Sequence, residues 1–378
     1  MQIVEAKSPR DLSRFIRIPR ELYSGIAGYQ PPVDLERKLL LHPKWAPFAT
    51  HGEVALFIAE DGNGRPLGRI SAQFDRLTPP ERAGTGHFGC LDAVDDPRVV
   101  AALIATARRW HAERGRHRIE GPFTYSINEE AGVQIEGQQH GDMVLMPWHP
   151  PYLGALVEQA GLAPVKDLLA YSISSTVAQR WTGARVARLS QQSRVTVRHL
   201  NLWKLGAEAA IMTELFNASW KDNWGFIPLA TAELATLLQI ARPVMKASYG
   251  IILEMDGKPV AFAFALPNAY ELIRGFGGRL LPFNWARLIW RLMTHTYRTG
   301  RVTLLGVHAD LRDTLLGASL PIVAIANLIS ANPVDGEIEM GWILDDNVRM
   351  SRIIENAGGR ISKRYRLYGD APAEGIAE

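Results

Sequence analysis

Apolar residues along this 378-residue chain follow two different spacings. Short, mostly apolar runs indicate buried strands, and longer stretches with apolar residues every three or four positions indicate helices. A turn containing glycine between two apolar runs is typical of a β-hairpin. The pattern predicts hairpins at 57–67 and 252–260, strands at 118–123 and 302–307, and helices at 97–114, 152–159, 285–297, 315–328 and 348–356. Alternation of strands with helices predicts an α/β (α+β) chain.

One spacing of residues occurs twice. The pattern E-x-A-G-x4-K-x4-Y begins at Glu158 and again 197 positions later at Glu355, and it ends at Tyr171 and Tyr368. In both copies a predicted helix ends at a glycine and a final strand follows. The two hairpins precede these copies in the same order. The repeat predicts two tandem modules, 1–175 and 190–370, each with a mixed central sheet flanked by helices.

Composition agrees with a folded two-domain protein. Hydrophobic residues form 47% of the chain and charged residues 21%, and the length exceeds that of a typical single domain. A net charge of +3 is too small to indicate nucleic-acid binding. The only cysteine, Cys90, is expected to be a core thiol, with a nucleophile as the alternative. The charged N-terminus does not resemble a secretion signal, so we expect a cytoplasmic protein.

The segment 302–318, VTLLGVHADLRDTLLGA, combines a strand, a loop and a helix start. It resembles the acyl-CoA motif R/Q-x-x-G-x-G/A of the GNAT superfamily. Arg312 and Gly317 match the motif, whereas Leu315 stands where its middle glycine would be. Segments 121–129 and 219–226 look similar to a bacterial family of double GNAT-like proteins that includes lipid N-acyltransferases similar to bacterial ceramide synthases.

The resemblance implies where acyl-CoA would bind. Backbone N–H groups at the helix start would bind the CoA pyrophosphate at the positive end of the helix dipole. Asn347 is the second predicted contact, and a helix N-cap is its alternative or additional role. The predicted cofactor residues are Val307, Arg312, Leu315, Leu316, Gly317, Ala318 and Asn347. The corresponding loop of the first module, 121–132, has no such motif, so it would shape an acceptor pocket or be a plain polar loop.

Amide formation from a thioester needs a neutral amine, a donor to the oxyanion and a proton source for the thiolate. Backbone N–H groups at the end of strand 302–307 would stabilise the oxyanion, as the resemblance implies. Glu339 is the first candidate for the base and His308 the second, although either can be structural. Tyr365 or Tyr368 would protonate the thiolate unless these tyrosines only pack in a strand. Ligand spacing typical of a metal site is absent from the sequence, so we expect no metal.

Segment 272–306 carries six arginines and no acidic residue. Within it, apolar residues of the predicted helix share one face and arginines another, which is typical of a basic amphipathic helix. Residues 285–298 would therefore contact the inner face of a membrane or form a core helix with a basic outer face. Nucleic acid is not an expected partner.

Three functions remain open at this point. The first is transfer of a long acyl group from CoA to an amine, with a sphingoid-type lipid base as the acceptor. The second is a non-catalytic scaffold of GNAT fold that binds acyl-CoA or a protein. The third is transfer from an aminoacyl-tRNA, as in some tandem GNAT-like proteins.

Overall fold

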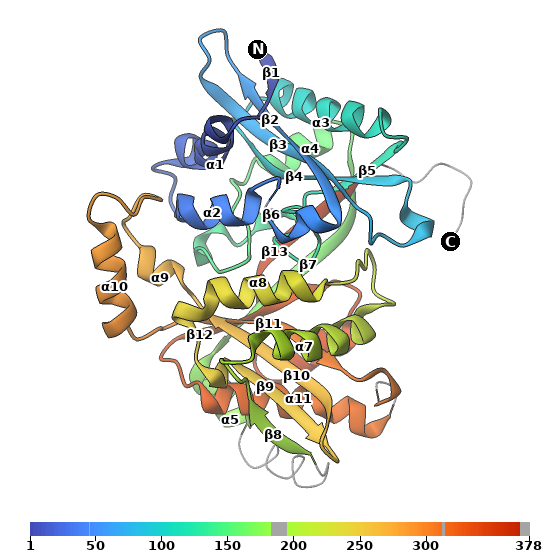
Figure 1. Cartoon of the computed structure of the whole chain (residues 1–378), viewed down its shortest axis with the longest axis vertical. Coiled ribbons are helices and arrows are strands. Elements are labelled where there is room, and N and C mark those ends of the chain that lie inside the picture. The colour runs from blue at the N-terminus through green and yellow to red at the C-terminus, as the bar shows by residue number, and fades with distance from the viewer. Residues whose placement is uncertain (45, 183–194, 312–313, 371–378) are drawn as a thin grey trace. The chain divides into compact units, whose positions relative to one another are not determined.

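The computed structural model describes residues 1–44, 46–182, 195–311 and 314–370 (Figure 1). Its contacts gather into two compact units. Within the described residues, unit 1 comprises Met1–Leu168, Ile273–Trp285 and 363–370, and unit 2 comprises Leu169–Leu272 and Ala286–Ser362. The mixed α/β class predicted from the sequence is confirmed.

Unit 1 contains a mostly antiparallel sheet with the strand order β1-β2-β3-β4-β5-β13, and β6 pairs with β13. β4 and β5 run parallel to each other over three residues. Its elements are β1 (Gln2–Glu5), α1 (Pro9–Tyr23), α2 (Asp34–Leu41), β2 (Gly52–Glu60), β3 (Pro66–Asp75), β4 (Thr85–Ala93), α3 (Pro97–Ala112), β5 (Arg118–Gly121), β6 (Val133–Glu136), α4 (Leu153–Gln159) and part of β7 (Ala163–Ser174) and β13 (Arg360–Gly369).

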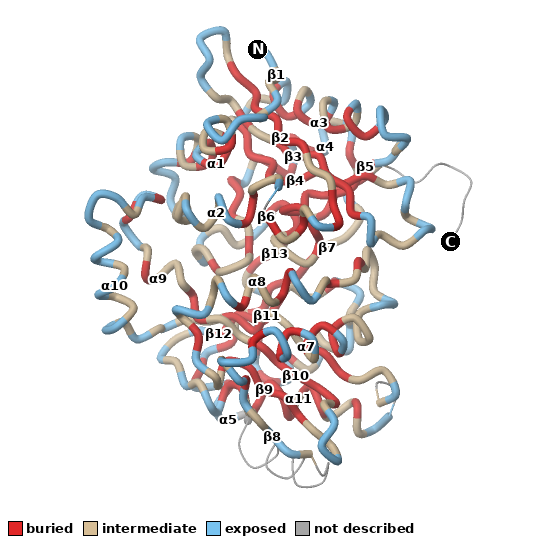
Figure 2. Tube along the Cα trace, in the orientation of Figure 1, coloured by how far each residue is buried: buried red, intermediate tan, exposed pale blue. Residues whose placement is uncertain are grey.

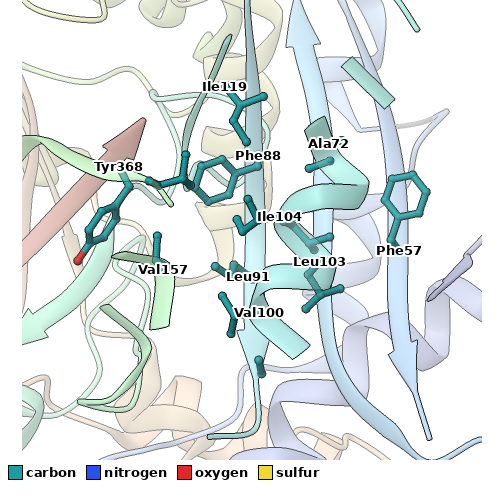
Figure 3. Close-up of a cluster of buried hydrophobic side chains, with 14 of the residues drawn as sticks. Phe57, Ala72, Phe88, Leu91, Val100, Leu103, Ile104, Ile119, Val157 and Tyr368 are labelled. Carbon is teal, nitrogen blue, oxygen red and sulfur yellow. The ribbon is translucent and has the colours of Figure 1, made fainter. Parts of the chain in front are cut away.

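Helix α3 covers one face of this sheet because its apolar residues recur at helical spacing. Val99, Val100, Leu103, Ile104 and Ala107 are all buried against the strands. Figure 3 shows several of these side chains together with residues of β2, β3 and β4. Each large apolar side chain buried in this way stabilises the fold by about 1.5–3 kcal/mol relative to exposure.

Unit 2 has the strand order β7-β12-β11-β10-β9-β8. Ala261 and Ala263 of β10 pack in one core with α11, and Phe262 and Phe264 pack in another with α7 and α8. Since successive strand residues point to opposite faces, α11 and α7 cover opposite faces of the sheet. The elements are α5 (Ser175–Thr182), β8 (Thr196–His199), α7 (Leu205–Trp220), α8 (Thr231–Ala241), β9 (Gly250–Met255), β10 (Lys258–Pro267), β11 (Gly300–Val307), α11 (Leu315–Ala331), β12 (Glu337–Leu344) and α12 (Val348–Asn356), with most of α9 (Tyr270–Ile273) and of α10 (Asn284–Thr294).

The repeated glutamate and tyrosine make two equivalent hydrogen bonds. In unit 1, the Tyr368 hydroxyl donates to Glu158 Oε1 at 3.3 Å, and in unit 2 the Tyr171 hydroxyl donates to Glu355 Oε1, also at 3.3 Å. Each bond therefore joins the glutamate of one sequence copy to the tyrosine of the other. The compact units differ in this respect from the predicted modules 1–175 and 190–370, because the end of each final strand belongs to the opposite unit.

Most predicted elements agree with the structure. The helices predicted at 97–114, 315–328 and 348–356 correspond to α3, α11 and α12, and both predicted hairpins are present. The long uncharged run 314–334 forms α11, a largely buried helix with apolar residues on all sides. Among the described residues, no helix combines the length and hydropathy needed to cross a bilayer.

Candidate active site

Two parallel strands of unit 2 separate part of the way along their length. β11 and β12 are in register at Gly300, Arg301 and Val302, which pair with Ile338, Glu339 and Met340. The pairing ends there, although the strands continue to Val307 and Leu344. A cavity of about 250 Å³ occupies this region. Its lining comes from five elements and includes Ser219, Trp220, Asn223, Thr303, Leu305, Val307, Gly317, Trp342, Asn347, Arg349 and Met350.

Buried Arg301 of β11 binds β12 at the point where the two strands begin to separate. Its Nε and Nη2 donate to the carbonyl oxygen of Gly341 at 3.0 and 2.8 Å. The Glu339 carboxylate lies 3.8 Å from Arg301 Nε, and both residues are only 4% exposed. Glu339 is thus part of a buried ion pair, where loss of one partner leaves the other charge uncompensated. It is not among the residues that line the cavity.

Two side chains of α7 satisfy backbone groups on the open edge of β11. Ser219 Oγ accepts from the Val307 N–H at 3.2 Å, and Trp220 Nε1 donates to the Leu305 carbonyl oxygen at 3.1 Å. Because the N–H and C=O of one strand residue point to the same edge, the Leu305 N–H is directed to this edge as well. The cavity therefore has a backbone donor within an otherwise largely apolar wall.

The start of α11 contributes to the same cavity. Thr314 is its N-cap, and its Oγ1 accepts from the Gly317 N–H at 3.0 Å. Gly317 lines the cavity, whereas the Leu315 side chain is 93% exposed and does not. The leucine at the middle position of the motif therefore leaves the cavity open. Its own N–H and that of Leu316 belong to the first helical turn, whose donors have no intrahelical partner.

Asn347 has the N-cap position predicted as one of its roles. Its Oδ1 accepts from the Met350 N–H at 3.1 Å at the start of α12. Asn347 also lines the cavity, so the geometry is compatible with contact to a ligand. Arg312, the remaining motif residue, lies outside the described residues. Ala318 donates its N–H to the Thr314 carbonyl oxygen at 3.0 Å, as expected one turn into the helix.

The other predicted catalytic residues are not in the cavity lining. His308 follows β11, with its side chain 40% exposed and its Nδ1 3.7 Å from Asp310 Oδ2. Tyr365 and Tyr368 are fully buried residues of unit 1. Burial, together with the nearby Glu158 carboxylate, raises the pKa of Tyr368. Their catalytic roles stay predictions.

Sequence reasoning gave no role to Arg301, Ser219, Trp220 or Trp342, which shape the site. Ser219 and Trp220 lie in segment 219–226, in which the sequence shows only a family resemblance. Nothing local in the sequence indicates that a serine and a tryptophan at a helix end bind the edge of a strand more than 80 positions away.

Unit 1 also contains a pair of parallel strands, β4 and β5, but a segment of the chain fills the space beside β4. β4 and β5 pair in parallel at three positions, from Thr85 with Arg118 to His87 with Glu120. After this point the chain turns back onto β4: Phe123 N–H donates to the Phe88 carbonyl at 2.8 Å, and the Phe123 carbonyl accepts from Gln73 Nε2 at 2.9 Å. Segment 122–132 thus occupies the space beside β4.

Both units contain a pair of parallel strands, and in unit 2 this pair separates beside a helix start. This fold and the relatives described below define the class of this protein as a tandem GNAT-fold N-acyltransferase. Solved structures share the fold. A tandem GNAT protein from the clavulanic acid biosynthesis pathway aligns over 99% of both chains with a TM-score of 0.56 and 13% identity. The glucosamine N-acetyltransferase region of a fungal multi-domain β-N-acetylglucosaminidase gives a TM-score of 0.57 and 15% identity over 97% of this chain and 38% of the longer one.

Curated relatives narrow the class to a family. The chain is 38% identical to the bacterial ceramide synthase of Caulobacter vibrioides (strain NA1000 / CB15N), over 98% of this chain and 97% of the relative. It is 37% identical to protein YghO of Escherichia coli (strain K12), over 95% and 92% of the two chains. No family model matches. This chain belongs to the family of the bacterial ceramide synthase.

Proposed function

We propose that this N-acyltransferase transfers a long-chain acyl group from a CoA thioester to the amino group of a sphingoid-type lipid base. The observation that carries the proposal is the cavity between β11 and β12, which reaches the start of α11. It offers backbone donors for a phosphate-bearing carrier at one place and an apolar wall for the acyl group at another. The name of the relative from Caulobacter vibrioides supports the choice of acceptor.

In this proposal the CoA pyrophosphate lies at the N-terminus of α11. The N–H groups of Leu315 and Leu316 point toward it, and the helix dipole favours its negative charge. Arg349, which lines the cavity, adds a positive charge. Arg312 and Asn347 keep the roles that the motif implies for them.

The thioester carbonyl would accept a hydrogen bond from the Leu305 N–H. The neutral amine attacks the carbonyl carbon, the new C–N bond forms, and the oxyanion is stabilised by this fixed donor. The C–S bond then breaks and the amine loses its proton, so the products are an amide and free CoA with its thiol protonated. A preorganised donor of this kind is worth about 3–4 kcal/mol of transition-state stabilisation.

The described lining of the cavity contains no aspartate, glutamate, histidine or tyrosine. We therefore assign proton transfer to water in the cavity and a positioning role to Glu339. By its ion pair Glu339 orients Arg301, which in turn fixes the Gly341 carbonyl where β12 leaves β11. His308, Tyr365 and Tyr368 do not line the cavity, and their catalytic roles stay predictions apart from this mechanism.

The proposal gives the first unit no CoA. The space beside β4 that would correspond to the cavity holds segment 122–132 of the chain itself. A side chain at Gly89 would collide with the Phe123 carbonyl oxygen, because an added β-carbon would lie 1.5 Å from it. This tight packing leaves no room for a pantetheine arm.

Purified protein incubated with a long-chain acyl-CoA and a sphingoid base tests the function. We expect free thiol and an N-acylated product of matching mass to appear in equal amounts. An O-acylated product, or transfer only to soluble amines, would contradict the choice of acceptor. A matched reaction with the same base blocked at its nitrogen should release no thiol above the rate of hydrolysis.

A non-catalytic acyl-CoA-binding scaffold is the second candidate, because no acid or base lines the described part of the cavity. The two candidates differ in one measurement. A scaffold would bind acyl-CoA tightly and release no thiol with any chain length or amine. The enzyme would bind acyl-CoA and also release thiol.

A further inference from the structure

Helix α10 and the residues before it present large apolar side chains to solvent. No residue of α10, all of which the structure describes, is buried. In Figure 2 the helix lacks the red of buried positions. Phe283 and Met293 are 75% exposed and Trp290 is 61% exposed. We call this the α10 surface, made up of Leu281, Phe283, Trp285, Ile289, Trp290 and Met293.

The α10 surface is held in shape by local hydrogen bonds. The Trp285 N–H donates to the Leu280 carbonyl at 2.8 Å, and its indole Nε1 donates to the Pro282 carbonyl at 3.0 Å. Asn284 Nδ2 donates to the Arg279 carbonyl at 2.8 Å. The turn before the helix is therefore ordered with its apolar side chains outward. This contradicts the alternative expected from the sequence, in which α10 is a core helix with only its basic face exposed.

The segment that carries the α10 surface is rich in arginine. Arg274, Arg279, Arg287 and Arg298 are exposed and Arg291 is half-buried, while no acidic residue occurs in 272–306. The acidic residue just before this stretch, Glu271, is engaged, since its oxygens accept from His295 Nε2 at 2.7 Å and Thr299 Oγ1 at 2.6 Å. Within 272–306 the charged side chains, apart from the histidine, are thus all arginines, and Arg279 and Arg298 are exposed.

We propose that the α10 surface docks the protein on an anionic lipid bilayer. Exposed tryptophan and phenylalanine side chains favour the boundary between headgroups and acyl chains, and nearby arginines favour negatively charged headgroups. A bilayer meets both requirements over the whole length of the helix. A protein partner would need an apolar groove bordered by carboxylates. The helix lies in the interface and does not span the membrane. The proposal stands independently of the acyl acceptor.

Sedimentation with lipid vesicles tests this docking. The full chain should bind vesicles that contain about one third phosphatidylglycerol in phosphatidylcholine at least about tenfold more tightly than vesicles of phosphatidylcholine alone. The double variant Trp290→Glu with Met293→Glu should lower binding to the anionic vesicles by about tenfold or more. The double variant Arg279→Gln with Arg298→Gln should weaken binding mainly at low salt, because headgroup attraction is screened by ions.

Trp203→Glu is the matched control, since Trp203 is another strongly exposed tryptophan, 88% accessible, outside the α10 surface. It should bind like the wild type. Unchanged thermal unfolding of each variant shows that the fold is intact, as expected for exposed positions. Equal vesicle binding by Trp290→Glu/Met293→Glu and wild type overturns the proposal. So does a concentration-dependent dimer that this variant abolishes, because the surface would then bind a second copy of the chain.

Discussion

Gly317→Asp places a carboxylate where the proposed pyrophosphate meets α11. Gly317 lines the cavity and lies at the third position of the helix, with its N–H bonded to the Thr314 hydroxyl. Two unit charges about 4 Å apart near a protein surface interact by about 4 kcal/mol. With partial screening by water, we expect a loss of about 2–4 kcal/mol in CoA binding, or roughly 30- to 1000-fold in the dissociation constant.

The substitution should not harm the fold by its charge. An aspartate in the first turn of a helix interacts favourably with the helix dipole, and aspartate has a higher helix propensity than glycine. CoA binding is therefore expected to weaken while the free energy of unfolding stays the same or rises. Thermal unfolding of the protein without ligand measures the change in stability.

Calorimetric titration with CoA and with pantetheine, which lacks the pyrophosphate, separates the contributions to binding. Gly317→Asp should weaken CoA and leave pantetheine nearly unchanged. Gly317→Asn, of equal size and without charge, is the control and should keep most of the affinity for CoA. Equal losses in both variants would mean that side-chain volume is responsible, and no loss in either would place the pyrophosphate elsewhere.

Three further predictions concern the same structure. Glu339→Gln should lower kcat/KM by roughly 10- to 100-fold through misplacement of the cavity wall while the pH profile keeps its shape; disappearance of the acidic limb would instead make Glu339 the base. Thr314→Ala should cost about 1 kcal/mol in urea unfolding, and Thr314→Ser should restore it, because only the hydroxyl caps α11. Burial lowers the pKa of His87 to about 3 and that of His111 to about 4. Both histidines stay neutral in the folded protein, whereas in the unfolded chain they protonate near pH 6.5. Their contribution to stability is therefore retained above that pH, and the free energy of unfolding should fall by about 3 kcal/mol from pH 7 to pH 5. Replacing both histidines with glutamine should make the free energy of unfolding less dependent on pH in this range.

Much of the fold could be predicted from local patterns. The hairpins, the apolar face of α3 and the uninterrupted apolar run of α11 each follow from the order of apolar and polar residues within one segment. Of the predicted binding residues, Val307, Gly317 and Asn347 line the cavity, since the strand-loop-helix motif is itself local. Arg301 could not be identified, because its partner at Gly341 is 40 residues away and comes next to it only through sheet pairing.

The sequence by itself determined the α/β class, the presence of two related halves and the place of the strand-loop-helix segment that resembles an acyl-CoA motif, because hydrophobic periodicity and a repeated spacing are properties of the chain alone. Only the tertiary structure decided which glutamate binds which repeated tyrosine, since Glu158 meets Tyr368 and not Tyr171. It also decided that Leu315 points into solvent and that Trp290 and Met293 of α10 stay exposed. These outcomes depend on which distant segments pack against each surface. The periodicity within one segment does not indicate which segments those are.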